Sequence, residues 1–186
     1  MPEGADAGIY LWILTRIAGL TAYAVLALAL LTGLSLRSAV LAPLATNRVL
    51  RGTHEFATVL WIPLGVVHLG GLLLDTTAHI GIAQLVVPLT APYGTLALAL
   101  GAVSLDLLLL VIASGLLRST WRSRLPARLG SWVHRLAYLA FGCVFLHALL
   151  AGTDFASLLI SSIACAIAGA LGLLTISRIV WGRLAD

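Results

Sequence analysis

The chain has 186 residues, of which 61% are hydrophobic and only 10% are charged. Soluble domains carry about 25% charged residues, so this composition excludes a soluble globular protein. The basic excess is modest, with 11 Lys and Arg against 7 Asp and Glu. We interpret it as loop charge that orients a membrane protein, not as a surface for nucleic acid.

Five apolar segments follow one another along the chain, each near the ~20 residues that a membrane-spanning helix needs. They cover about Ile9–Leu36, Phe56–Leu74, Tyr93–Leu117, Trp132–Ala151 and Phe155–Val180. The sequence therefore predicts an all-α integral membrane protein. We expect a five-helix transmembrane bundle that forms a single domain over residues 1–186.

Charged residues in the connections predict the orientation of this bundle. Arginines occupy alternate connections and the end of the chain: Arg37, Arg48, Arg51, Arg118, Arg122, Arg124, Arg128, Arg178 and Arg183. The opposite side holds Glu3, Asp6, Asp75 and Asp154, with no Lys or Arg in its loops. Because basic loops stay on the cytoplasmic side, we expect an outside N-terminus, a cytoplasmic C-terminus and a place in the cell (inner) membrane.

Two of the predicted helices each carry a pair of histidines in an apolar run. His54 and His68 are 14 residues apart (68 minus 54), and His134 and His147 are 13 apart (147 minus 134). At about 1.5 Å per residue, each pair is separated by roughly 20 Å along its helix. The predicted orientation puts His54 and His134 near the cytoplasmic face, and His68 and His147 near the outer face.

Burying a histidine within the membrane costs free energy unless its ring nitrogens form hydrogen bonds or bind a metal. Such a residue is therefore a candidate functional residue by default. For a single histidine, the simplest role is a hydrogen bond to a neighbouring helix. For four at two matched depths, we predict the axial ligands of two b-type haems, each clamped by one imidazole from each helix. With both axial positions filled, such a haem transfers electrons and does not bind oxygen on the iron.

The spacings do not suit one face of a straight helix. At about 100° per residue, 14 residues return to within roughly 40° of the same face, but 13 residues miss it by roughly 140°. The second histidine helix therefore needs curvature, an irregularity near Gly142, or ligation from different sides. Pro63 should kink the first one between its histidines. We find no internal repeat beyond these two helices.

The connection Thr76–Pro92 is interrupted by Pro88 and is too short to span the membrane. Because it is apolar for a loop, we expect it to lie along the outer interface or to fold over the outer haem. Trp12, Trp121, Trp132 and Trp181 lie near segment ends and are expected to be interface anchors.

Other polar residues have more than one reasonable role. Arg135 follows His134 and could meet an inner haem propionate or anchor the helix at the interface. Arg16 lies about two turns inside the first helix, where it could pair with an outer haem propionate, position an acceptor or reach the interface. Asp106 could be neutral, pair with Arg16 or relay protons.

Glu55 and His79 are two further candidates. Glu55 neighbours His54, and His79 lies in the outer loop, where it most simply faces solvent and could alternatively contact an acceptor or a metal. Cys143 and Cys165 fall inside apolar runs without metal-binding spacing, so we expect packing residues and no disulfide.

Three segments resemble the ferric reductase-like transmembrane domain, whose family includes NADPH oxidases, ferric reductases and the haem subunit of bacterial methionine sulfoxide reductase. They read WVHRLAYLAFGCVFLHALLAGTD, RGTHEFATVLWIPLGVVHLGGLLLD and LTRIAGLTAYAVLALALLTGL, and the resemblance covers about residues 11–180. It implies two b haems, with His54 matched to His134 and His68 matched to His147. It also implies outward electron flow and an arginine near the outer haem, a place that Arg16 fits.

The resemblance has departures that bear on the electron donor. NADPH oxidases and ferric reductases continue into FAD- and NADPH-binding domains, whereas this sequence shows no glycine-rich dinucleotide fingerprint before Asp186. It also has five predicted spans where full oxidases have six. We therefore expect a separate donor, a flavoprotein reductase or a quinol, at the arginine-rich cytoplasmic face, and an extracytoplasmic acceptor.

Other functions remain open. The chain could be the haem-bearing subunit of an oxidoreductase whose active site lies in a partner. It could be an anchor in a respiratory or photosynthetic complex. It could also be a cofactor-free transporter-like bundle that uses Arg16, Asp106 and the histidines for proton or ion passage.

Overall fold

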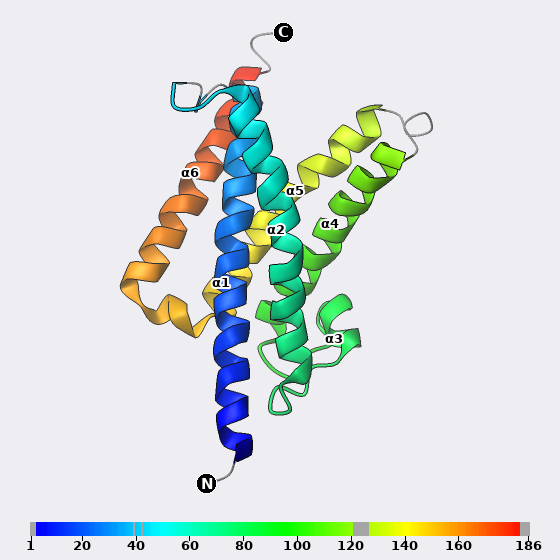
Figure 1. Cartoon of the computed structure of the whole chain (residues 1–186), viewed down its shortest axis with the longest axis vertical. Helices are drawn as coiled ribbons and strands as arrows, with labels where there is room; N and C mark the ends of the chain where they lie inside the picture. The colour runs from blue at the N-terminus through cyan, green and yellow to red at the C-terminus, as the bar shows by residue number, and fades with distance from the viewer. Residues whose placement is uncertain (1–2, 39, 42, 121–126, 183–186) are drawn as a thin grey trace. The chain divides into compact units, whose positions relative to one another are not determined.

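The computed structural model describes residues 3–38, 40–41, 43–120 and 127–182, the backbone alone for residues 3–7, 118–120, 127–128 and 181–182. Arg122, Arg124, Arg183 and Trp121 lie outside the described residues, as do the side chains of Arg118, Arg128 and Trp181. Every regular element within this part is helical (Figure 1). The elements are α1 (Glu3–Ser38), α2 (Asn47–Leu74), α3 (Ile82–Val86), α4 (Thr95–Thr120), α5 (Ala127–Ala151), the short 3-10 helix η1 (Thr153–Ala156) and α6 (Leu158–Gly182).

Five of these helices are long and apolar enough to cross a membrane, namely α1, α2, α4, α5 and α6. This confirms the all-α class and the number of candidate spans, and it indicates a multi-pass membrane protein. The largest difference is at α2, which begins at Asn47 and not near Phe56. Thr46 caps this helix by accepting a hydrogen bond from the Val49 amide at 3.4 Å. The added turns are polar, so hydropathy alone does not mark them.

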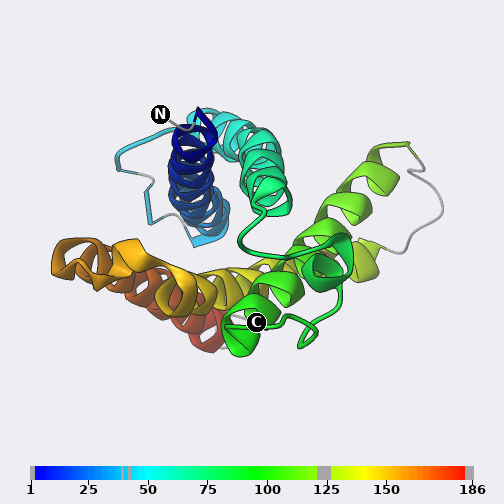
Figure 2. The same ribbon diagram turned by 90° about the horizontal axis from the view of Figure 1, so that it is seen from below.

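The chain divides into two compact units, which we describe separately: Met1–His79 with Ala156–Asp186, and Ile80–Phe155. In the first unit, α1 packs against α2 and also contacts α6. In the second unit, α4 packs against α5 and also contacts α3. Figures 1 and 2 show α1 and α2 side by side as an antiparallel hairpin. Each unit thus contains one helical hairpin whose second helix carries two histidines.

The contact between α1 and α2 follows a repeat of 3.5 residues, which we call the seam. Steps of four and three residues link positions 15, 19, 22, 26, 29 and 33 of α1, and positions 50, 54, 57, 61, 64, 68 and 71 of α2. Ala22, Leu26 and Ala29 in the first series are buried, as are Leu50 and Ala57 in the second. Such a repeat keeps one face of each helix against its neighbour. In the second unit, α4 shows the same steps at positions 97, 101, 104, 108, 111 and 115.

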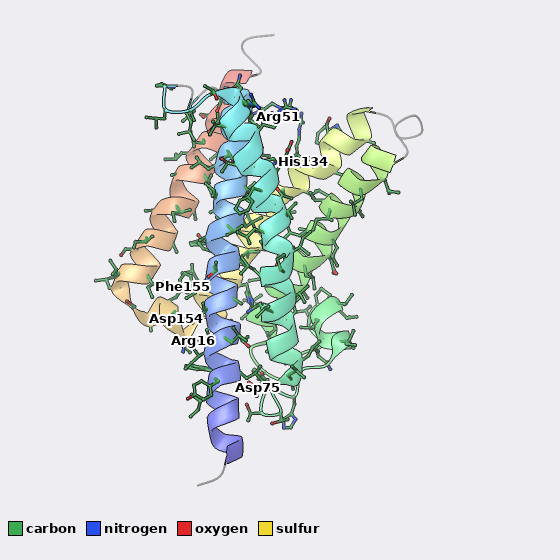
Figure 3. The ribbon with its side chains drawn as sticks, viewed as in Figure 1. Arg16, Arg51, Asp75, His134, Asp154 and Phe155 are labelled. Carbon is green, nitrogen blue, oxygen red and sulfur yellow. The ribbon has the colours of Figure 1, made fainter. Side chains whose placement is uncertain are left out.

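The two ends of the first hairpin differ in charge. Arg37, Arg48 and Arg51 are exposed at the end where α1 leads into α2. Asp75 lies at the opposite end of α2 from Arg51 (Figure 3). Its carboxylate accepts hydrogen bonds from the Thr77 hydroxyl at 2.6 Å and the Thr77 amide at 2.9 Å, and these bonds lower the pKa of Asp75. The hairpin therefore has the charge separation on which the predicted orientation depends.

A buried polar contact joins α6 to α1. The Tyr23 hydroxyl donates a hydrogen bond to the Ala164 carbonyl oxygen at 3.1 Å, and Tyr23 is only 6% exposed. Ala164 and Leu171 are seven residues apart (171 minus 164) on one face of α6, and both are buried. The small alanine side chain lets the phenol reach the backbone of α6.

Replacing Tyr23 by phenylalanine keeps the ring and removes this hydrogen bond. We expect the free energy of unfolding to fall by about 1 kcal/mol, the usual net value of one hydrogen bond. Unfolding in detergent, followed by circular dichroism, measures the difference. Tyr10→Phe, at a side chain that is 71% exposed, is the control. An equal loss in both variants would contradict a role for the Tyr23 bond.

Candidate functional site

Both histidines of α2 hydrogen-bond the backbone of α1. The Nδ1 atom of His54 lies 2.7 Å from the Ala29 carbonyl oxygen, and Nδ1 of His68 lies 3.0 Å from the Thr15 carbonyl oxygen. A carbonyl oxygen can only accept, so Nδ1 carries the proton in each ring. In a neutral imidazole the lone pair is then on Nε2, which is the atom able to ligate a metal.

The second unit repeats this arrangement with α5 and α4. Nδ1 of His147 lies 2.8 Å from the Ala97 carbonyl oxygen. The same argument puts the proton on Nδ1 of His147 and the lone pair on Nε2. All three rings are half-buried, whereas His134, nearer the start of α5, is exposed.

A glycine lies against each of these three rings, four residues after the carbonyl group that accepts the hydrogen bond. A Cβ atom added to Gly19 would lie 2.8 Å from Nδ1 of His68. At Gly33 it would lie 3.1 Å from Cε1 of His54, and at Gly101 it would lie 3.0 Å from Nδ1 of His147. A Cβ atom at Gly19 would force a shift, and one at Gly33 or Gly101 would require the ring to give way by a few tenths of an ångström, so glycine lets the rings lie where they do.

We call each carbonyl with its glycine a histidine seat. The seats are Thr15 with Gly19, Ala29 with Gly33, and Ala97 with Gly101. In an α-helix the carbonyl oxygen of residue i accepts from the amide of residue i+4 and keeps a second lone pair. A glycine at i+4 opens that lone pair to a side chain from the neighbouring helix.

The seam explains the 14-residue spacing in the first hairpin. At 3.5 residues per turn, 14 residues make four whole turns, so the drift of roughly 40° expected for a straight helix is removed. Gly19 and Gly33 are also 14 apart (33 minus 19), as are Gly101 and Gly115 (115 minus 101). The internal repeat is therefore larger than predicted, because it includes the glycines of α1 and α4. That spacing is the signal that sequence reasoning missed.

α5 leaves this register at its first histidine. The residue 14 positions before His147 is Val133, and His134 lies one residue further on, about 100° around the helix. The predicted irregularity near Gly142 is wrong, because α5 is one unbroken α-helix from Ala127 to Ala151. Beside Gly115, the counterpart of Gly33, a Cβ atom would have nothing within 4 Å. Curvature of α5, or ligation from another side, remains the prediction for His134.

The predicted kink at Pro63 concerns α2. This helix continues without a break from Asn47 to Leu74 through Pro63, and the kink stays a prediction.

The two predicted propionate ligands each stack on a tryptophan of their own helix. The Arg16 guanidinium carbon lies 4.0 Å from the Trp12 ring centroid, and that of Arg135 lies 5.0 Å from the Trp132 ring centroid. Cation–π contacts reduce the cost of a guanidinium near lipid. Arg16 directly follows Thr15, the seat of His68, and Arg135 directly follows His134. Figure 3 shows Arg16 on α1.

The remaining candidates do not belong to the seats. Asp106 is half-buried and lies two residues beyond position 104, about 200° around α4 and so on the opposite side of the helix from that position. Glu55 is exposed, and so is His79, which has a positive φ of 48°. Cys143 and Cys165 are free thiols, and Cys165 is exposed, not packed.

The seated histidines can be compared with what a bare metal ion or a haem would need from the protein. Among the described residues, no group of three or more His, Cys, Asp or Glu side chains could hold a metal ion. A haem iron takes four ligands from the porphyrin, so two neutral imidazoles complete it. The seats present Nε2 of His54, His68 and His147 in the tautomer that this ligation requires.

Comparison of the chain with family models, curated proteins and solved structures finds no match. The similarity to the ferric reductase-like family therefore remains a prediction from the quoted segments. The function has to be argued from the histidine seats.

Proposed function

We propose that this chain is a dihaem membrane cytochrome b that carries electrons across the bilayer. His54 and His134 are assigned to the inner haem, and His68 and His147 to the outer haem. The observation that carries the proposal is the histidine seat, which occurs twice in the first hairpin and once in the second, where Ala97 with Gly101 corresponds to Thr15 with Gly19.

A hydrogen bond from the second ring nitrogen to a carbonyl is the usual support of a metal-bound histidine. It sets the tautomer, orients the ring and raises the basicity of the ligating nitrogen. A purely structural histidine also needs a partner, and on a helix carbonyl it would need the same glycine beside the ring. Glycine inside a helix costs about 1 kcal/mol relative to alanine. The presence of glycine at all three seats, despite this cost, therefore supports a role in which the exact position of each imidazole ring matters, as it does for a haem ligand.

The two ligand levels fit transfer across a membrane. Fourteen residues of α2 separate His54 from His68 by roughly 21 Å, which covers most of a hydrocarbon core about 30 Å thick. A b haem held by two imidazoles at each level would supply one-electron transfer. Arg16 and Arg135 are assigned to the propionates of the outer and inner haems, where a guanidinium binds a carboxylate through two hydrogen bonds.

We assign the arginine-rich side to the cytoplasm and the protein to the cell (inner) membrane, following the positive-inside rule. The exposed arginines Arg37, Arg48 and Arg51 then face the electron donor, a flavoprotein reductase or a quinol. The acceptor lies on the Asp75 side. The ferric reductase-like resemblance of the three quoted segments supports the same direction of electron flow.

Purification of the full chain in mild detergent tests the proposal. We expect a red protein with two b haems per chain by pyridine haemochrome assay, and a difference spectrum typical of low-spin haem after dithionite reduction. A colourless preparation from haem-replete cells would refute the proposal. Subunits that co-purify would identify the chain as the haem-bearing part of a larger oxidoreductase.

A further inference from the structure

The segment between α2 and α4 displays large apolar side chains at the Asp75 end of the spans. Ile82 is 72% exposed, Val87 is 50% exposed and Leu89 is 68% exposed. Residues 76–105 contain no Asp, Glu, Lys or Arg. Soluble loops are polar, so this segment does not have the composition of one that faces water.

Several backbone groups of this segment form hydrogen bonds within it. The Gly81 amide donates to Oε1 of Gln84 at 3.1 Å, and the Val87 amide donates to the Ala83 carbonyl at 2.8 Å. The Thr90 hydroxyl donates to the Val87 carbonyl at 2.7 Å. Polar backbone groups satisfied in this way can leave bulk water at little cost.

Leu89 has an unusual backbone conformation. Its φ angle is 68°, in the left-handed region that bulky side chains avoid. It directly follows Pro88, in a position of the turn where glycine or asparagine is expected. Strain at such a residue persists only where something offsets it. Burial of a leucine side chain in hydrocarbon is a favourable term of comparable size.

We propose that residues 81–90 form a lipid-contacting segment that inserts Ile82, Val87 and Leu89 into the membrane interface on the Asp75 side. The segment directly joins two membrane-spanning helices, and α3 packs against α4 (Figure 1), so it is continuous with the lipid-facing surface of the second unit. Without charged residues it offers no electrostatic recognition to a protein partner. The proposal is independent of the haems.

Site-directed spin labelling of the full chain in phosphatidylcholine nanodiscs tests this insertion. In a variant with Cys143→Ala and Cys165→Ala, single cysteines at Ile82 and Leu89 carry the label, and a cysteine at the exposed Thr76 is the control. We expect labels at 82 and 89 to collide several-fold more with oxygen, and several-fold less with a water-soluble nickel chelate, than the label at 76.

The other outcomes overturn the proposal. Labels at 82 and 89 that are as accessible to the nickel chelate as the control would place the segment in water. Labels shielded from both reagents would show that protein or a cofactor covers the segment. A circular dichroism spectrum that matches the unsubstituted chain establishes that each labelled variant is folded.

Discussion

Replacing His68 by alanine is expected to remove the outer haem and to leave the inner haem in place. The variant loses the imidazole that the Thr15 carbonyl orients, so the outer haem would lose one of the two residues proposed to hold it. His54 is seated separately on Ala29, roughly 21 Å away along α2, and its ligand geometry should persist. Haem content per chain is therefore expected to fall by half in the pyridine haemochrome assay.

Alanine variants of the other three assigned histidines test which two residues hold the same haem. His147→Ala should give the same residual spectrum and midpoint potential as His68→Ala, and the double variant should lose no more haem than either single variant. His54→Ala and His134→Ala should share the complementary spectrum. The control is His79→Asn, because His79 is exposed and asparagine tolerates its positive φ. Retention of both haems by His68→Ala would refute the ligand assignment.

A leucine at Gly101 is expected to remove the outer haem almost as completely as the loss of His147. Even a Cβ atom at this position would lie 3.0 Å from Nδ1 and 3.1 Å from Cε1 of His147. The larger side chain must push the ring off the Ala97 carbonyl and turn Nε2 away from its ligating direction. Gly19→Leu acts on the same haem from the other hairpin, because its Cβ atom would lie 2.8 Å from Nδ1 of His68.

Alanine at Gly101 provides the graded test. We expect the outer haem to be retained, with a changed low-spin electron paramagnetic resonance signal and midpoint potential, because the imidazole tilts but still ligates. Gly70→Leu is the matched control, since nothing lies within 4 Å of a Cβ atom at Gly70, two residues from His68. It should keep both haems. If Gly101→Leu also keeps full haem content and unchanged potentials, His147 is not positioned by this seat.

Several properties follow from the sequence alone because they depend on local composition. Hydropathy over a window of about 20 residues predicts the five spans, since each spanning helix must satisfy its own backbone in lipid. The positions of the arginines and acidic residues in the connections predict an orientation, because basic loops stay on the cytoplasmic side. The two histidine pairs also stand out locally, since each interrupts an apolar run. The candidate ligands can therefore be predicted from the sequence without information on their tertiary contacts.

The tertiary structure decided what holds those ligands. The hydrogen-bonded partners are far apart in the sequence: 53 residues separate Thr15 from His68, and 50 separate Ala97 from His147. No local sequence pattern therefore predicts which carbonyl accepts from which imidazole. The role of Gly19 appears only when the ring of His68 lies against it. The 3.5-residue repeat of the α1–α2 contact also places His54 and His68, 14 residues apart, on one face of α2. In α5, by contrast, His134 lies about 100° around the helix from the position 14 residues before His147. Hydropathy is a property of each segment, whereas the tautomer and direction of an imidazole are set by the neighbouring helix.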